Sequence, residues 1–136
     1  MRSLTEQEED EIVDVQLKTR TVDGVSILEV AGELDIYTSP KLKSAIQNAL
    51  TSGRARLVVN LLRTTYLDST ALSVLTTAQK QAREAGGNLG LVFDQPQIEK
   101  IFTITGLQRV FPIFRTETDA MNEARSWIAA VPPKRK

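Results

Sequence analysis

The run Arg56–Leu61 is short and apolar, a composition typical of a β-strand that is covered on both faces. It lies between two segments whose apolar residues recur at helical spacing, one from Ser39 to Gly53 and one from Ser69 to Gly86. Helical crossovers join parallel neighbouring strands. The sequence therefore predicts an α/β fold built around this strand.

The N-terminal part of the chain predicts an antiparallel hairpin. From Ile12 to Lys18, apolar and polar residues alternate as they do in a half-buried strand. Asp23-Gly24 is typical of a tight turn, and the β-rich run Val25–Ala31 follows it. We expect residues 32–38 to form a loop after this second strand.

The first helix is expected to begin at Ser39, with its hydroxyl as N-cap and Pro40 at the first helical position. Gly53 is expected to end it. The buried stripe of this helix is predicted to consist of Leu42, Ala45, Ile46, Ala49 and Leu50.

Strand and helix patterns continue to alternate in the C-terminal half. Residues 65–67 are expected to form a connector into the long helix, which Gly86-Gly87 ends. A strand over 89–93 follows. After it we expect a short helix that begins near Asp94 and Pro96 and is closed by Gly106, and then a brief strand over 111–114. Thr116 and Asp119 have the spacing of a capping box at the start of a final helix. The inward-facing residues of that helix are predicted to be Met121, Ala124, Trp127 and Ile128.

These patterns predict one mixed β-sheet with an N-terminal antiparallel hairpin, mainly parallel remaining strands and about four α-helices. A chain of 136 residues suits a single domain, expected over residues 12–130. We expect residues 1–11 to be a flexible acidic tail and residues 131–136 a flexible basic tail.

Composition excludes several classes of function. Seventeen basic and seventeen acidic residues cancel, which favours neither direct nucleic-acid binding nor attraction to an anionic membrane. The sequence contains no histidine and no cysteine, so it can form no Ser-His or Cys-His nucleophile pair and no His-ligated zinc site. It shows no apolar stretch of about 20 residues and no secretory signal pattern. A cytoplasmic protein is the default expectation.

The segment Asp68-Ser69-Thr70 is the most informative site candidate, because there a connector from the central strand enters a helix. Unpaired peptide N–H groups and the helix dipole make such a place favourable for an anion. Asp, Ser and Thr are also the preferred N-cap residues, so on spacing and chemistry alone helix capping is favoured over function. Both interpretations remain open at this point.

Catalytic interpretations of this segment find little support. A serine nucleophile needs an adjacent base, and the motif contains neither histidine nor lysine. The glycine-rich phosphate-binding pattern that ends in Gly-Lys-Ser/Thr is absent. Asp35 and Asp68 could act as acid and base or hold a cation, but nothing in the sequence sets their separation. We expect no enzyme activity, no cofactor and no metal.

At these residues the sequence resembles the STAS family (sulfate transporter and anti-sigma factor antagonist), specifically its free-standing anti-sigma factor antagonists. The resemblance covers roughly residues 12–130 and implies a STAS-like fold. Four segments carry it in this order: Gly32–Asp35, Leu67–Thr70, Gly86–Leu89 and Ile101–Phe111.

The resemblance implies that Ser69 is a phosphoacceptor. It implies as partners an anti-sigma factor that is also a serine kinase, using ATP and magnesium, and a metal-dependent serine phosphatase. The unphosphorylated protein would bind the kinase and release sigma factor, and phosphorylation would end that binding. By the same resemblance, the partner-facing surface would comprise Asp35, Thr38, Asp68, Thr70 and Leu72.

Ala71 departs from the family, which commonly has glycine at this position. Its methyl group could hinder a docking kinase, so we include Ala71 in the predicted partner surface. The departure also leaves open a STAS scaffold or regulatory subunit without a phosphorylation cycle, in a signalling or transport complex. A module that binds a small ligand or nucleotide at the same helix start is a further alternative. The oligomeric state is not predicted.

Overall fold

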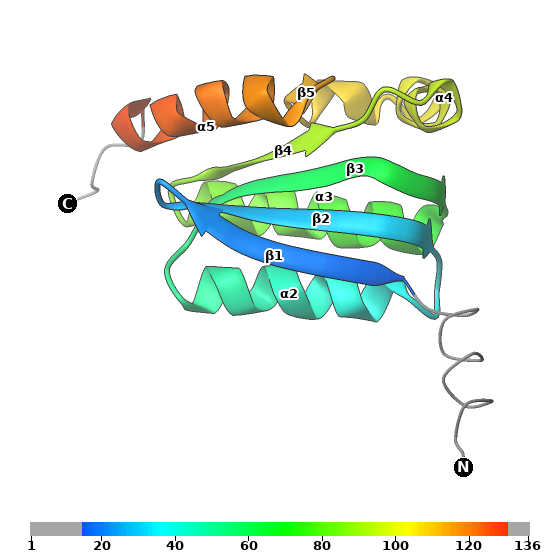
Figure 1. Cartoon of the computed structure of the whole chain (residues 1–136), viewed down its shortest axis with the longest axis horizontal. Helices are drawn as coiled ribbons and strands as arrows, with labels where there is room; N and C mark the ends of the chain where they lie inside the picture. The colour runs from blue at the N-terminus through cyan, green and yellow to red at the C-terminus, as the bar shows by residue number, and fades with distance from the viewer. Residues whose placement is uncertain (1–14, 131–136) are drawn as a thin grey trace, which may run out of the picture.

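The computed structural model describes residues 15–130, and these residues form one sheet flanked by helices (Figure 1). The predicted tails and residues 12–14 of the predicted first strand lie outside the described residues. The strands are β1 (Gln16–Val22), β2 (Val25–Leu34), β3 (Arg56–Leu67), β4 (Asn88–Val92) and β5 (Ile113–Phe114). The helices are α2 (Ser39–Thr51), α3 (Ser69–Glu84), α4 (Pro96–Thr105), the 3-10 turn η1 (Leu107–Arg109) and α5 (Glu117–Ala130).

The sheet has the predicted mixed topology. Its strand order is β1-β2-β3-β4-β5, with β1 and β2 antiparallel and each later pair parallel. Asp23 and Gly24 both have positive φ, 53° and 79°, as a two-residue hairpin turn requires. A Cβ at position 24 would lie 2.5 Å from Arg56 Nη2, so glycine is also needed there for space.

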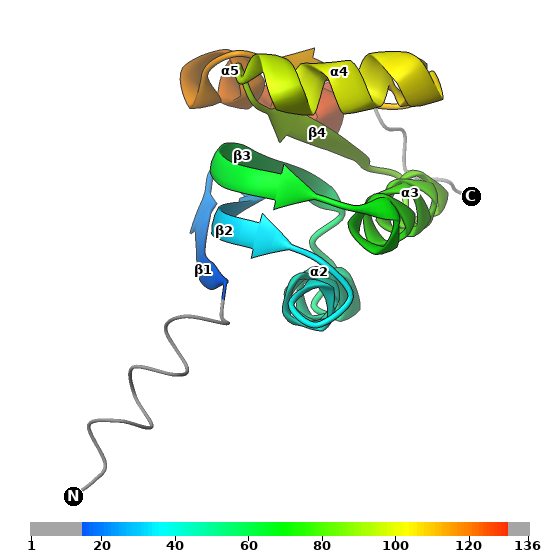
Figure 2. The same cartoon turned by 90° about the vertical axis from the view of Figure 1, so that its right-hand side faces the viewer.

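Helices cover the two faces of the sheet unequally (Figure 2). Buried side chains of α2, α3 and α4 share the larger core with one face of β2, β3 and β4. Buried side chains of α5 form a smaller core on the opposite face, where they pack against Ile27, Val58 and Val92. The run Leu57–Leu61 is buried throughout, which confirms that this strand is covered on both faces.

Both central strands run further than predicted. β2 continues to Leu34 instead of ending before Gly32, and the expected connector 65–67 belongs to β3. The extensions pair with each other through two register shifts, one between Glu29 and Ala31 and one between Gly32 and Glu33. Polar residues and a glycine at these irregular positions break the alternation, and for this reason the sequence pattern missed the strand ends.

Beside the second half of β3, a side-chain amide makes hydrogen bonds to the backbone on the side where β4 pairs with the first half. Pairing between β3 and β4 ends at Asn60 and Val92. Beyond that point, Gln95 Nε2 donates to the carbonyl oxygens of Leu61 (2.8 Å), Leu62 (3.1 Å) and Thr64 (2.8 Å). Gln95 thereby holds the part of β3 that leads to Ser69.

The start of α2 differs from the prediction. Thr38, and not Ser39, occupies the N-cap position, and Ser39 is the first helical residue. Ser39 Oγ is buried and has no hydrogen-bond partner among residues 15–130. At α5, the peptide N–H of Asp119 donates to Thr116 Oγ1 at 3.1 Å, which confirms the predicted cap. Met121, Ala124 and Trp127 are buried as predicted, and the side chain of Ile128 lies outside the described residues.

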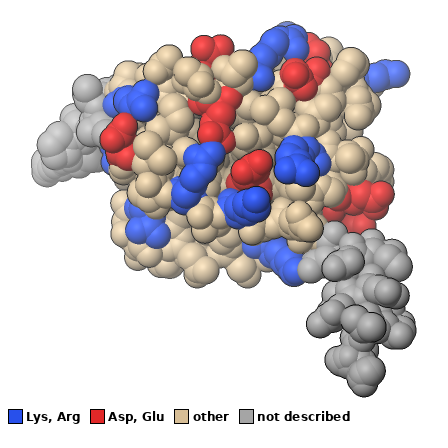
Figure 3. Space-filling model, in the orientation of Figure 1, with Lys and Arg blue, Asp and Glu red and all other residues tan. Residues whose placement is uncertain are grey.

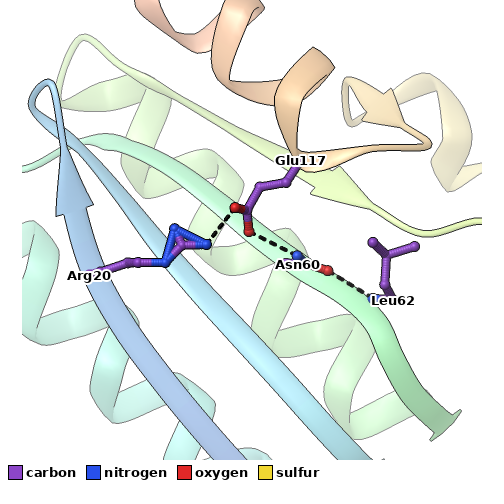
Figure 4. Close-up of polar contacts among 4 residues, drawn as sticks. All are labelled: Arg20, Asn60, Leu62 and Glu117. Carbon is purple, nitrogen blue, oxygen red and sulfur yellow. Dashed lines mark hydrogen bonds and ion pairs between the residues drawn. The ribbon is translucent and has the colours of Figure 1, made fainter.

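A polar network fastens α5 across the sheet (Figure 4). Glu117 accepts hydrogen bonds from Arg20 of β1 and from Asn60 Nδ2 of β3, the latter at 2.9 Å. Asn60 Oδ1 in turn accepts from the peptide N–H of Leu62 at 2.9 Å. Asn60 is the one polar residue in the buried run Leu57–Leu61. Both the nitrogen and the oxygen of its side-chain amide therefore have hydrogen-bond partners.

Candidate functional site

The carboxyl ends of β2 and β3 bring two sequence-distant segments together (Figure 1). Leu34 pairs with Leu67 in the parallel register, and the peptide N–H of Asp68 donates to the Leu34 carbonyl at 3.1 Å. The loop 35–38 and the start of α3 therefore emerge side by side. Ligands and partners of open α/β sheets commonly bind at this edge.

Ser69 is exposed at the first position of α3, and the residue before it caps the helix. Asp68 has extended backbone angles, and its Oδ1 accepts from the peptide N–H of Ala71 at 3.1 Å. Because Asp68 supplies the cap, the helix does not need the Ser69 hydroxyl for that purpose. The structure assigns the cap of α3 to Asp68 and leaves Ser69 exposed, and a functional role of Ser69 stays a prediction.

Asp35 organises the neighbouring loop. Its Oδ1 accepts hydrogen bonds from the peptide N–H groups of Tyr37 (2.9 Å) and Thr38 (3.0 Å), and Thr38 Oγ1 lies 3.1 Å from the same oxygen. The bond from the Thr38 peptide N–H is the largest cause that lowers the pKa of Asp35, and it outweighs desolvation, which acts in the opposite direction. Asp35 is thus held ionised as an acceptor within its own loop.

Two residues of the predicted partner surface face inward. Thr38 is buried, and its hydroxyl donates to the Glu33 carbonyl at 2.7 Å and accepts from the Asp35 peptide N–H at 2.9 Å. Ala71 is fully buried within the larger core. The burial of both side chains argues against a place for Thr38 and Ala71 on a partner surface, and their predicted role there stays a prediction. The Ala71 methyl group points into the protein, where it cannot obstruct a docking kinase.

The structure adds exposed apolar residues that the sequence analysis did not select. Ile36 (61% exposed) and Tyr37 (86%) lie in the loop after β2, and Tyr66 (51%) lies near the end of β3, where it pairs with Glu33. Two consecutive large apolar residues in a predicted surface loop were the available signal. We call Ile36, Tyr37 and Tyr66 the apolar rim of the Ser69 site.

A shallow cavity adjoins the same site. It has a volume of about 190 Å³ and lies between α2 and α3, with Lys43, Thr70 and Val74 in its lining. Thr70 links it to Ser69, and Leu72 is partly buried one turn along α3. Of the predicted residues, Asp35, Asp68, Ser69, Thr70 and Leu72 thus remain on or near one surface.

The two carboxylates of the surface are already engaged in hydrogen bonds. Asp68 and Asp35 each already accept backbone hydrogen bonds. Within residues 15–130, His, Cys, Asp and Glu side chains form no group of three or more that could hold a metal ion. Basic and acidic side chains are interleaved on the face in Figure 3, where no basic stripe crosses the described surface. In the same part of the chain, no helix has the length and apolar character that a bilayer crossing requires.

Comparisons with known proteins agree with this architecture. An anti-sigma-B factor antagonist of Listeria monocytogenes is 33% identical over 105 residues, which cover 77% of this chain and 91% of the relative. The crystal structure of an anti-sigma factor antagonist from Mycobacterium paratuberculosis has a TM-score of 0.75 at 29% identity, covering 82% of this chain and 94% of the other. Phosphorylated SpoIIAA, a Bacillus cell fate determinant, shares the fold at 21% identity, with a TM-score of 0.64 and coverage of 82% and 99%.

The family assignment rests on most of the chain. Residues 16–120 match the STAS domain, which includes all of β1 to β5 and the start of α5. The resemblance noted from the four sequence segments is thus confirmed over the described sheet. The chain belongs to the STAS domain family.

Proposed function

We propose that this protein is an anti-sigma factor antagonist whose affinity for its anti-sigma factor is set by phosphorylation of Ser69. The observation that carries the proposal is the exposed hydroxyl of Ser69 at the start of α3, beside a cap supplied independently by Asp68. The names of its relatives, anti-sigma-B and anti-sigma F factor antagonists, support the choice of partner class. The SpoIIAA fold, solved in unphosphorylated and phosphorylated forms, supports the mode of control.

The unmodified surface is suited to a close protein contact. The apolar rim exposes two tyrosines and an isoleucine on the two segments that meet at the carboxyl ends of β2 and β3. Aromatic residues are enriched in protein interfaces because they bury much apolar area at a small cost in conformational entropy. The anti-sigma factor would pack on this rim and over the start of α3.

Phosphorylation would act on the interface and leave the fold intact. A phosphate adds a charge of about −1.5 to −2 at neutral pH, and the positive end of the α3 dipole tolerates that charge. Packing a partner over it would require desolvation of a dianion beside Asp68. A hundredfold loss of affinity needs about 2.7 kcal/mol, which an uncompensated buried charge readily supplies.

In this proposal Ser69 is a substrate, and the catalytic groups belong to other proteins. The anti-sigma factor would be the serine kinase and would supply ATP and magnesium, and a serine phosphatase would reverse the modification. Both would act in the cytoplasm, where sigma factors bind RNA polymerase. The protein itself would be neither an enzyme nor a nucleic-acid-binding module.

The proposal is tested by titrating the purified cognate anti-sigma factor with three variants. Ser69→Ala should bind like the wild type and remain bound after incubation with ATP, because it cannot accept phosphate. Ser69→Asp should bind at least about tenfold more weakly, since it places a charge in the interface. Ser126→Ala, at an exposed serine of α5, is the matched control and should keep both binding and its loss with ATP.

Intact-mass measurement completes the test. The wild type and Ser126→Ala should gain one phosphate with the kinase and ATP, and Ser69→Ala should gain none. Equal affinity of Ser69→Ala, Ser69→Asp and wild type, before and after ATP, would contradict the proposal. A scaffold without a phosphorylation cycle would give that result. Ala71, the feature that favoured such a scaffold, has its methyl group in the core.

A further inference from the structure

A second cavity is lined by residues of α4, η1, β5 and the segments next to them, and Ser69 is not among its lining residues. The elements α4 and β5 lie at the upper side of the molecule in Figure 1. Its volume of about 380 Å³ lies within the usual range for small-molecule sites. Its described lining comes from the end of β4, from α4 and from the segment 108–115, whereas the Ser69 site lies at the ends of β2 and β3.

The floor of this cavity is aromatic. Phe93, Phe102 and Phe111 are buried, and Ile113 of β5 completes the apolar lining. The ring centroids of Phe93 and Phe102 are 5.0 Å apart in a stacked arrangement, and Phe111 meets Phe102 edge-on at 6.0 Å. These three rings and Ile113 together make the base of the cavity apolar.

The mouth of the cavity is polar and carries one charge of each sign. Glu99, Thr103, Gln108 and Arg115 line it, and all four residues are exposed. Glu99 Oε2 and Arg115 Nη2 are 3.4 Å apart, with side chains 50% and 64% exposed. An ion pair of this length and exposure contributes little to stability, so both groups can take a better partner at small cost.

Adjacent opposite charges above an aromatic floor match one class of ligand. A free α-amino acid carries an ammonium and a carboxylate on the same carbon atom, Cα, which also carries the side chain. The ammonium would donate to Glu99, the carboxylate would accept from Arg115 and from the Gln108 amide, and an apolar side chain would enter the Phe-lined floor. We propose that this cavity is a binding site for a free amino acid with a large apolar or aromatic side chain.

Binding to the full-length protein can be measured by calorimetry and thermal shift with L-phenylalanine and L-leucine, each at up to about 10 mM. Phenylacetate has the carboxylate without the ammonium, and phenethylamine has the ammonium without the carboxylate. At least one of the two amino acids should raise the melting temperature. The single-charge compounds should bind at least about tenfold more weakly than phenylalanine, since each loses a charge-assisted hydrogen bond.

Variants locate the site. Glu99→Gln and Arg115→Gln should each weaken amino-acid binding about tenfold without changing the melting temperature of the unliganded protein appreciably, because both side chains are exposed. Glu84→Gln and Arg63→Gln, at exposed positions outside the cavity, are the matched controls and should bind normally. The proposal is overturned if neither amino acid binds, if phenylacetate or phenethylamine binds as tightly as phenylalanine, or if binding survives both cavity variants.

Discussion

At the scale of single residues, the burial of Ala71 bears on its difference from the glycine that the family commonly has at this position. The side chain lies in the larger core on the inner side of α3, and its peptide N–H donates to Asp68. The position therefore concerns the stability of the helix start, whereas the proposed partner contact lies at the neighbouring Ser69.

Ala71→Gly should lower the free energy of unfolding by about 1 kcal/mol or somewhat more. Glycine costs about that amount in a helix, and the lost methyl group leaves a small buried void. Urea unfolding measures the change, and Ser73→Gly, at an exposed position of the same helix, controls for helix propensity alone. Partner affinity should not rise in Ala71→Gly; an increase would show that the methyl group does obstruct docking.

Asp35 makes a pH-dependent contribution. Its pKa is lowered in the folded protein from the ordinary value of 3.8, so it stabilises the fold above that value. The contribution is lost as pH falls through the lower, folded pKa, when the carboxylate becomes protonated.

The stability difference between wild type and Asp35→Asn should therefore be largest near neutral pH and should shrink in acid. Melting temperatures from pH 7 down to about pH 2.5 would show this convergence. Asp94→Asn is the control variant, because Asp94 is exposed and its described hydrogen bond is made by its peptide N–H to Gln95 Oε1. A difference between wild type and Asp35→Asn that stays constant with pH would show that the carboxylate charge has no role in the loop.

At the scale of elements, the second half of β3 pairs with β2 on one side and is bound on the other side by one side chain from the start of α4. Gln95 satisfies three carbonyl groups that have passed the end of pairing with β4. The same stretch of β3 leads to Tyr66 and to the cap of α3. The position of the Ser69 site therefore depends on Gln95, which lies 31 to 34 residues further along the chain than the carbonyl groups it binds.

Gln95→Leu should destabilise the protein by about 1–3 kcal/mol, because it removes the donor and leaves partly buried carbonyls without it. Gln97→Leu, at an exposed position two residues further along α4, should have little effect. Chemical denaturation compares the two variants, and hydrogen exchange should show faster exchange over residues 61–67 in Gln95→Leu. Equal stability of the two variants would mean that water replaces the amide without loss.

At the scale of the whole molecule, α5 is joined to the open face of the sheet through Glu117 (Figure 4). This carboxylate connects β1, β3 and α5, and its two partners differ in burial. Asn60 is buried, whereas the Arg20 side chain is about half exposed. Loss of the shared acceptor should therefore cost more than loss of the arginine.

Glu117→Ala should reduce the free energy of unfolding by about 1–3 kcal/mol, since it leaves the buried Asn60 amide without its acceptor. Arg20→Ala should cost less than about 1 kcal/mol, as is usual for exposed ion pairs. Asp119→Ala, another acidic residue in the first turn of α5, controls for the helix dipole. A larger effect of Arg20→Ala than of Glu117→Ala would contradict this order.

Local patterns in the sequence were sufficient for the type and order of the elements. The apolar run at Leu57–Leu61, the helical spacing after Ser69, and the turn residues Asp23-Gly24 and Gly106 each depend on a few neighbouring residues. The antiparallel hairpin and the parallel remainder follow from connection lengths. These features also placed Ser69 at a helix start.

Tertiary structure alone decided which side chains at that helix start are available to a partner. Thr38 and Ala71 lie beside the exposed residues in sequence yet face inward, because burial depends on which neighbour packs against each face of a helix or loop. The lengths of β2 and β3 depend on each other and on Gln95, and the apolar rim exists only because the two strand ends meet. Such contacts join residues far apart in the chain, and no local periodicity encodes them.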